Sequence, residues 1–337
     1  MQERERTVLV TGGAGYVGAV LCPMLIDAGY RVRVLDTCWY GRDVFPTISG
    51  HPSFELRVGD IRNQKDVERA VSGCSDVIHL ACISNDPSYD LDPQLGEDIN
   101  FRAFEPLVSA ARSSGVARFI YASSSSVYGI KQELKVTEDL PLEPLTDYSR
   151  FKALCEDVLN SYASDAFTVT TIRPATVCGY SPRQRLDLVV NILVNHAVNK
   201  GAIRVFGGTQ YRPNLHIEDM CRAYLHVLDE SPERVQQQVF NVGGINHTVT
   251  ELAEIVRENV GGDVFLTVEP TDDNRSYRIA SDHIREALGF EPHKGVPDAV
   301  RDLVDAFRAG LLPDSFEDSN YFNIQKMNEI IGAATEA

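Results

Sequence analysis

The chain has 337 residues, 43% of them hydrophobic, so it is long enough to bury a large core in one domain or two. Its formal net charge of −16 argues against nucleic acid or an anionic membrane surface as the main partner. Seven scattered cysteines, with no CxxC pair and no Cys/His cluster, predict reduced thiols and no metal site. No apolar signal core or membrane span is found, so we expect a cytoplasmic protein that does not enter a membrane.

Strand-like and helix-like stretches alternate through the first half of the chain. Short apolar runs predict strands at 7–10, 31–35, 54–58, 76–80, 118–122 and 168–172. The stretches between and after them predict helices near 16–28, 63–72, 97–113 and 148–164. Such alternation is typical of βαβ units, and it predicts an α/β fold with a parallel sheet.

The spacing of elements becomes irregular after residue 177. Segments 178–216 and 245–320 mix short helical and strand patterns with Gly and Pro. We therefore predict a first domain over residues 1–177 and a smaller second domain over 178–337. No Pro/Ser-rich linker separates the two, so we expect parts of the second domain to return to the first.

A glycine-rich turn joins the first predicted strand to the first predicted helix. Gly12, Gly15 and Gly18 lack the Cβ that would block a tight turn, the approach of a pyrophosphate, or helix–strand packing. The helix start offers free N–H groups and a positive dipole end to a phosphate. The spacing is GxxGxxG rather than GxGxxG, which favours one oxidoreductase lineage over dinucleotide binders in general.

Acidic residues at the ends of the next strands extend this pattern. Asp36 ends the second strand, where a carboxylate accepts hydrogen bonds from both ribose hydroxyls of a dinucleotide and repels a 2′-phosphate. Asp60 ends the third strand, where it can bind an adenine amino group, and the fourth strand ends beside the diphosphate. These positions predict NAD rather than NADP as the cofactor.

A second group of residues has the properties of a proton-transfer site. Tyr148 and Lys152 stand four residues apart, so one helix face carries both. A nearby ammonium lowers the pKa of a phenol, and we expect Lys152 to make Tyr148 a general acid/base near neutrality. Ser124 follows the strand at 118–122, and a serine at that strand end can hydrogen-bond a hydroxyl or carbonyl undergoing oxidation or reduction.

Together these motifs resemble the extended short-chain dehydrogenase/reductase family. TGGAGYVG, Asp36, GDIR, HLAC, SSSSVYG and YSRFK occur in the order of that family, from about residue 7 to residue 290. They look most like its NAD-dependent nucleotide-sugar epimerase/dehydratase branch. The resemblance implies a doubly wound Rossmann domain, bound NAD, a smaller substrate domain and a nucleoside-diphosphate sugar as substrate. By motif, Ser124 is then the catalytic hydroxyl, Tyr148 the acid/base and Lys152 its partner.

The same resemblance assigns binding residues. The expected cofactor-binding residues are Gly12, Gly15, Tyr16, Val17, Gly18, Asp36, Asp60, Ile61, Leu80, Ala81, Cys82, Asn100, Tyr148 and Lys152. The expected substrate-binding residues are Ser84, Asn85, Ser125, Ser126, Thr176, Arg212 and Arg275. Arg212 matches a diphosphate-binding arginine of the branch, whereas Thr176 replaces an asparagine that the branch usually carries.

Two reactions of the branch are disfavoured by individual positions. Its 4,6-dehydratases carry an Asp-Glu pair after the catalytic hydroxyl, where this chain has Ser125 and Ser126, and serine is a poor acid or base. Its 3,5-epimerase/reductases carry a cysteine at position 126 and a histidine beyond the next strand, and no histidine lies around residues 178–183. What remains is oxidation and reduction of a carbinol, most often at C4 of the hexose.

Three functions stay open, of which a nucleotide-sugar 4-epimerase is favoured. A C4 dehydrogenase or 4-ketoreductase is the second, since the loop at 84–89 resembles a subgroup that includes a bacterial GDP-heptose 4-dehydrogenase. A non-catalytic dinucleotide sensor is the third, and the intact Ser124, Tyr148 and Lys152 count against it.

The resemblance also implies a homodimer. In this branch the helices near 97–113 and 148–164 usually pair in a four-helix bundle between two copies. The first helix carries a suitable apolar stripe, made of Phe101, Phe104, Leu107, Val108 and Ala111. The alternative that we weigh is packing of this stripe on the sheet of the same chain.

Overall fold

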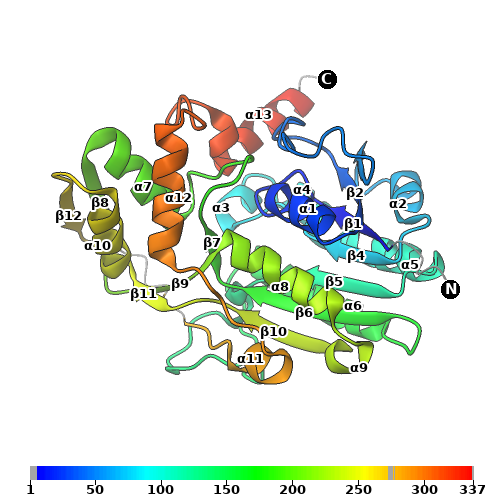
Figure 1. Cartoon of the computed structure of the whole chain (residues 1–337). Helices are drawn as coiled ribbons and strands as arrows, with labels where there is room; N and C mark the ends of the chain where they lie inside the picture. The colour runs from blue at the N-terminus through cyan, green and yellow to red at the C-terminus, as the bar shows by residue number, and fades with distance from the viewer. Residues whose placement is uncertain (1–5, 272–275, 277, 336–337) are drawn as a thin grey trace.

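A seven-stranded parallel sheet forms the centre of the computed structural model, which describes residues 6–271, 276 and 278–335 (Figure 1). In spatial order its strands are β10 (Gln238–Val242), β6 (Thr168–Pro174), β5 (Arg118–Ala122), β4 (Asp76–His79), β1 (Thr7–Thr11), β2 (Arg31–Asp36) and β3 (Phe54–Val58). The order along the chain reverses at β1, which pairs with both β2 and β4. In open α/β sheets the ligand crevice lies at such a switch point, outside the carboxyl ends of the strands.

Helices cover both faces of this sheet, as the doubly wound Rossmann class requires. Successive residues of β1 point to opposite faces: Val8 and Val10 join one apolar cluster and Leu9 joins the other. The first cluster lies against α1 (Gly18–Asp27) and α8 (Ile217–Asp229). The second lies against α2 (Gln64–Val71), α5 (Phe104–Ser113) and α6 (Asp147–Ser161). Burial on both faces explains why the sequence of β1 is a continuous apolar run.

Every strand predicted in the first half of the chain is confirmed to within about two residues, and three of the four helices are confirmed to within about three. The stretch at 97–113 is not one helix: a π-helical turn (Asp98–Arg102) precedes α5. The apolar stripe of this stretch packs within the chain. Phe104 and Leu107 are buried beneath the sheet, and the ring of Phe101 stacks on that of Phe151 at 5.0 Å. The stripe itself therefore gives no support to a four-helix bundle between two copies.

The second half of the chain builds a smaller lobe with its own core. Its helices are α7 (Val189–Lys200), α10 (Val249–Val260) and α12 (Val296–Arg308). Its strands are β7 (Thr176–Cys178), β8 (Ala202–Phe206), β9 (Tyr211–His216), β11 (Asn246–Thr248) and β12 (Phe265–Glu269). The same half also sends β10 and α8 back to the parallel sheet, so the two lobes interleave. The boundary at 177/178 stays a prediction.

The last helix returns from the smaller lobe to the first. The remaining short elements are α3 (Asp86–Tyr89), α4 (Pro93–Glu97), α9 (Pro232–Val235), α11 (Asp282–Leu288), α13 (Asn323–Thr335) and 3-10 turns at Ser125–Tyr128 and Ser319–Tyr321. Met327 of α13 is buried in the same apolar cluster as Leu35 and Val67, so α13 lies beside the first lobe (Figure 1). Among the described residues, no helix has both the length and the apolar character needed to cross a membrane.

Candidate active site

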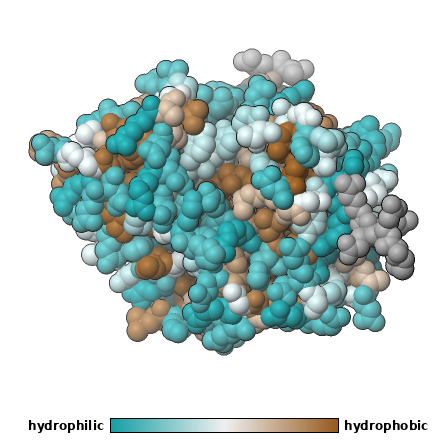
Figure 2. Space-filling model, viewed as in Figure 1, coloured by the Kyte–Doolittle hydropathy of each residue, from teal (hydrophilic) through white to brown (hydrophobic). Residues whose placement is uncertain are grey.

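A cavity of about 390 Å³ lies at the switch point, between the carboxyl ends of the parallel strands and the loop that follows β7. Its volume is within the range of small-molecule sites. The surrounding surface in this view is mostly hydrophilic, with apolar atoms near the centre, between α12 and α1 (Figure 2). The lining residues come from both lobes, so a ligand here would contact both halves of the chain.

The glycine turn forms the floor of the cavity and has no room for side chains. Gly12 has φ +72°, and a Cβ there would lie 2.5 Å from the backbone nitrogen of Ala81. A Cβ on Gly18 would lie 2.3 Å from the carbonyl oxygen of Gly13. The turn therefore lies directly against β4 and brings the backbone at the start of α1 to the cavity, which fits a diphosphate.

Asp36 lies beside this turn at the end of β2. Its Oδ2 accepts a hydrogen bond from the backbone N–H of Ala14 (3.0 Å), and its Oδ1 accepts one from Cys38 (2.7 Å). Burial raises the pKa of Asp36, while these two backbone donors and the charge of Arg183 lower it. Both oxygens keep further acceptor capacity on the cavity side, as a ribose diol requires.

Most of the predicted binding residues line this cavity. Besides Gly12, Gly18 and Asp36, they are Gly15, Tyr16, Val17, Asp60, Ile61, Leu80, Ala81, Cys82, Ser84, Asn85, Ser125, Ser126 and Thr176. Asn85 has φ +88°, a strained backbone held by its own side chain, which accepts from the N–H of Ser88 (2.9 Å). The carboxylate of Asp60 is already bonded to Arg62 (2.6 Å), so an adenine would have to share it.

Two predicted residues are placed differently, and a third is not described by the structure. Asn100 is buried behind the cavity wall, where its amide exchanges hydrogen bonds with the backbone of Ile83 at 2.8 and 3.0 Å. It supports the loop after β4 rather than lining the cavity. Arg212 lies on β9 and is not among the lining residues, and its Nη1 donates to the carbonyl of Tyr211 (3.0 Å). Arg275 lies outside the described residues.

The three predicted catalytic residues meet at the cavity. Tyr148 and Lys152 share one face of α6, and the Lys152 Nζ lies 5.9 Å from the centroid of the Tyr148 ring. That Nζ donates to the carbonyl of Ala122 (2.7 Å), which ties α6 to the end of β5. Ser124 begins the 3-10 turn after β5, and its hydrogen bond to Tyr148 favours the phenolate. The i, i+4 spacing and the strand-end serine thus converge on one point.

The prediction that Lys152 lowers the pKa of Tyr148 is not supported by this structure. Burial raises the pKa of the phenol well above its ordinary value, and Cys82 and Asp86 raise it further. Arg185 and the hydrogen bond from Ser124 act in the opposite direction, but burial dominates. The ammonium of Lys152 is turned to the Ala122 carbonyl, so the phenol is protonated at neutral pH unless another cation approaches it.

A series of hydrogen-bonded hydroxyl groups runs from Ser124 to a carboxylate. The Ser124 and Ser126 Oγ atoms are 2.9 Å apart, and Ser149 Oγ donates to Ser126 Oγ (2.9 Å). Ser149 Oγ lies 3.0 Å from Thr146 Oγ1, which donates to Asp86 Oδ1 (2.6 Å). This series of hydrogen bonds was not evident from the sequence, because Asp86 and Thr146 are 60 positions apart.

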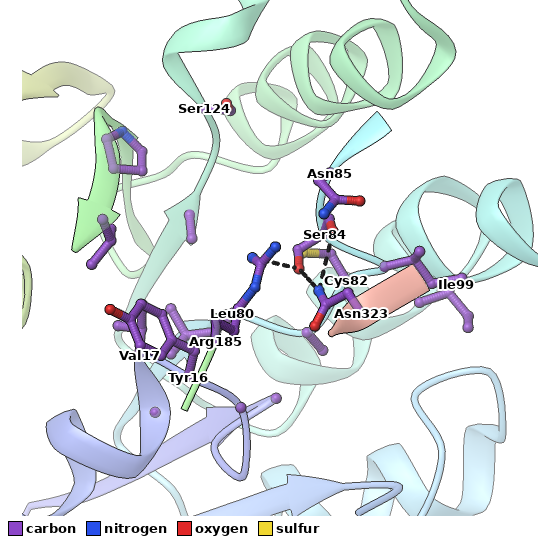
Figure 3. A pocket seen from close by; sticks show the side chains of 18 of the residues that line it. Tyr16, Val17, Leu80, Cys82, Ser84, Asn85, Ile99, Ser124, Arg185 and Asn323 are labelled. Atoms are coloured by element: carbon purple, nitrogen blue, oxygen red, sulfur yellow. Dashed lines mark hydrogen bonds between the residues drawn. The ribbon is translucent and has the colours of Figure 1, made fainter. Parts of the chain in front are cut away.

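The smaller lobe and the chain end supply cavity residues that the sequence analysis missed. Arg185 Nη1 donates to Ser84 Oγ (3.3 Å), and Asn323 Nδ2 donates to the same oxygen (3.0 Å), as Figure 3 shows. Arg183 and Tyr40 also line the cavity. Two arginines within three residues, just after an irregular Gly-Pro loop, were an available signal for an anion site. Nothing in the local sequence indicates that Asn323 lines the cavity.

Comparison with known proteins gives consistent matches. Residues 8–243 match the NAD dependent epimerase/dehydratase family. The chain is 30% identical to the low-salt glycan biosynthesis protein Agl12 of Haloferax volcanii (89% of this chain, 98% of that one). It is 28% identical to a UDP-glucose 4-epimerase of Lactobacillus helveticus (87% and 94%). It is 29% identical to a dTDP-glucose 4,6-dehydratase of Streptomyces griseus (87% and 91%).

Solved structures match along nearly the whole chain as well. MoeE5 in complex with UDP-glucuronic acid and NAD has a TM-score of 0.78 at 27% identity, covering 90% of this chain and 99% of that one. The dTDP-glucose 4,6-dehydratase DesIV of Streptomyces venezuelae has a TM-score of 0.81 at 25% identity, covering 90% and 97%.

Proposed function

Because the chain belongs to the NAD-dependent epimerase/dehydratase family, we propose that it is a nucleotide-sugar 4-epimerase that works through a 4-keto sugar. One observation carries the proposal. Ser124, Tyr148 and Lys152 meet at the switch point of the sheet, and the two positions after Ser124 are serines rather than carboxylic acids. The three residues supply the proton-transfer groups that oxidation and reduction need. The two serines leave the site without the acid and base that an elimination needs.

Each of the three residues has its own role at C4 of the sugar. The chemistry that bound NAD would supply is removal of the hydride at C4 and its return. Tyr148 Oη takes the proton of the C4 hydroxyl and gives it back, while Ser124 Oγ hydrogen-bonds the same oxygen. Lys152, fixed by the Ala122 carbonyl, has its Nζ 5.9 Å from the centroid of the Tyr148 ring and has N–H groups left for the coenzyme ribose.

The nicotinamide end of the coenzyme also bears on the pKa of Tyr148. Burial raises the pKa of this phenol, so a further positive charge beside the ring would favour the phenolate. Oxidised nicotinamide carries such a charge. We therefore expect the oxidised coenzyme to lower the pKa of Tyr148 and make it a better base.

Ser125, Ser126 and Thr176 line the sugar end of the cavity, and they support epimerisation over dehydration. Their hydroxyl groups can both donate and accept, so they can hold a keto sugar in either of two orientations. They cannot shuttle the protons that loss of a C6 hydroxyl requires. The relatives include both 4-epimerases and 4,6-dehydratases, and these positions support the first of the two.

A C4 dehydrogenase is the second candidate, and the hydroxyl chain favours it. Net oxidation releases one proton per turnover, whereas epimerisation releases none. The series of hydroxyl groups ends at Asp86, which is half-buried and offers an acceptor for that proton. Its members are Ser124, Ser126, Ser149 and Thr146. A dinucleotide sensor would need no such groups.

Two assays test the proposal together. The purified protein is denatured, the released coenzyme is identified, and UDP-, GDP-, CDP- and dTDP-sugars are screened for products. Tightly held oxidised NAD and a pair of C4 epimers from one sugar nucleotide are expected. Accumulation of a 4-keto product with one equivalent of NADH establishes the dehydrogenase instead.

A further inference from the structure

The loop that follows β7 is fastened to the glycine turn. Tyr16 Oη donates to the carbonyl of Gly179 (2.7 Å), and Ser181 Oγ donates to the carbonyl of Tyr16 (2.8 Å). Asn191 Nδ2 donates to the Tyr16 Oη (3.1 Å), so the start of α7 is tied to the same residue. All these side chains are buried. A segment of the smaller lobe is thereby held over the part of the first lobe where a dinucleotide diphosphate binds.

Arg183 is the residue of this loop whose charge is least compensated. Arg183 is 4% exposed, and its guanidinium lies 3.7 Å from the centroid of the Tyr40 ring and donates from Nη2 to Asn323 Oδ1 (2.6 Å). Its Nε is buried and has no hydrogen-bond partner among the described residues. An unpaired buried donor on a cation is costly unless a ligand completes it.

The neighbouring arginine shows the contrast. Arg185 has its own carboxylate, because its Nε and Nη2 bond the two oxygens of Asp187 at 2.9 and 3.2 Å. For Arg183 the described residues provide no carboxylate within ion-pair distance; Asp187 and Asp36 act on it only through space. Burial accordingly lowers the pKa of Arg183 to about 10, although Tyr40, Asp187 and Asp36 raise it.

We propose that Arg183 binds the diphosphate of the coenzyme, so that a residue of the smaller lobe completes the phosphate site begun by the glycine turn. Arg183 lines a cavity whose adjacent wall is that turn, and a diphosphate supplies the anion that the buried guanidinium lacks. Tyr40 and Asn323 fix the plane of the guanidinium.

A nucleotide sugar also carries a diphosphate, so the source has to be assigned. Arg183 lies against Tyr40, which follows β2 on the coenzyme side, and within electrostatic reach of Asp36, which ends β2. Arg185, by contrast, acts on Tyr148 and bonds Ser84 on the sugar side. The positions of the two arginines therefore favour the coenzyme as the ligand of Arg183.

Binding measurements on Arg183→Gln test the proposal without any reference to the net reaction. The protein is stripped of coenzyme, and calorimetry gives Kd for NAD, ADP and adenosine and for UDP, GDP, CDP and dTDP. We expect Kd for NAD and for ADP to rise about 10- to 100-fold, as for loss of a charge-assisted hydrogen bond, with adenosine and the substrate-type diphosphates unchanged. Arg308→Gln on α12 is the matched control, because it removes an exposed arginine. It should leave every Kd unchanged.

Three results would overturn the proposal: unchanged Kd for NAD and ADP, weaker adenosine binding by the same factor as ADP, or weaker binding of a substrate-type diphosphate with normal NAD binding. Circular dichroism establishes that the variant is folded. If Arg183→Gln does not fold, Arg183→Lys replaces it. Lysine keeps the charge but lacks the Nε donor and the planar group over Tyr40, so it should weaken NAD and ADP binding by a smaller factor.

Discussion

Tyr148 is the residue on which the proposed chemistry depends most directly. Tyr148→Phe removes the proton donor and acceptor and leaves the ring that packs beside Lys152. We expect turnover to fall by roughly 10²- to 10⁴-fold, the range typical of loss of general acid–base catalysis. The coenzyme should remain bound, since its diphosphate and ribose contacts are elsewhere. Steady-state kinetics together with coenzyme content checks this, and unchanged turnover would exclude Tyr148 as the acid/base.

Asp86 gives a second prediction at this scale, in the pH dependence. Its negative charge raises the pKa of Tyr148, after burial and Cys82. When Tyr148 acts as a base, activity rises with pH as the phenolate forms. Asp86→Asn keeps an acceptor for Thr146 but removes the charge, so the rising limb of the pH–rate profile should move to lower pH.

Asp90→Asn is the control for that experiment. Asp90 is exposed at the end of the same short helix and is not among the charges acting on Tyr148. Its profile should coincide with that of the unmodified enzyme. If the rising limb of the pH–rate profile lies at the same pH in Asp86→Asn as in the unmodified enzyme, the carboxylate does not act on the phenol.

At the scale of elements, a buried ion pair holds α6 against β6. Arg173 Nη2 and Glu156 Oε2 are 2.6 Å apart, both side chains are almost fully buried, and Ser123 donates to the same carboxylate. Glu156→Gln leaves a buried cation unpaired, so we expect a loss of about 3–5 kcal/mol in unfolding free energy from urea titration.

The exposed pair Asp305–Arg308 provides the comparison for Glu156→Gln. Its charged atoms are 3.6 Å apart and both side chains are largely in solvent. Asp305→Asn should change the unfolding free energy by about 0.5 kcal/mol or less. Equal effects of the two substitutions would mean that the Glu156 pair is not a structural clamp.

The helices and strands were predictable where the apolar residues follow one regular pattern along the sequence. The run at β5 gave its strand limits directly, because buried residues fill both faces of a strand inside a covered sheet. The stretch at 97–113 misled because side-chain pattern does not report a π-helical turn, which depends on backbone hydrogen bonds. The sequence-based expectation for the pKa of Tyr148 has a related weakness. The spacing places Lys152 on the same helix face, but it does not show that the ammonium bonds the Ala122 carbonyl.

For the whole molecule, the sequence predicted the parts of the site that follow strand ends. Asp36, Ser124 and Tyr148 belong to local motifs, and the parallel sheet brings such motifs to one edge. Arg183 and Asn323 come from segments with irregular local pattern, and only the tertiary packing brings them to the cavity. No local rule would place them there.

Homodimerisation is a prediction at this scale. Its support is the family to which the chain belongs, since the apolar stripe of α5 is used inside the protomer. Sedimentation velocity at micromolar concentration should give a species of twice the mass of one chain. A single monomeric boundary would contradict it.

The most direct test of reversible oxidation at C4 uses the sugar nucleotide that the substrate panel identifies, deuterated at C4 and incubated with the holoenzyme. We predict that mass spectrometry and NMR find the deuterium at C4 of both epimers, with the bound coenzyme recovered as NAD. Deuterium that leaves the sugar and accumulates on released coenzyme, in step with a 4-keto product, would contradict a 4-epimerase.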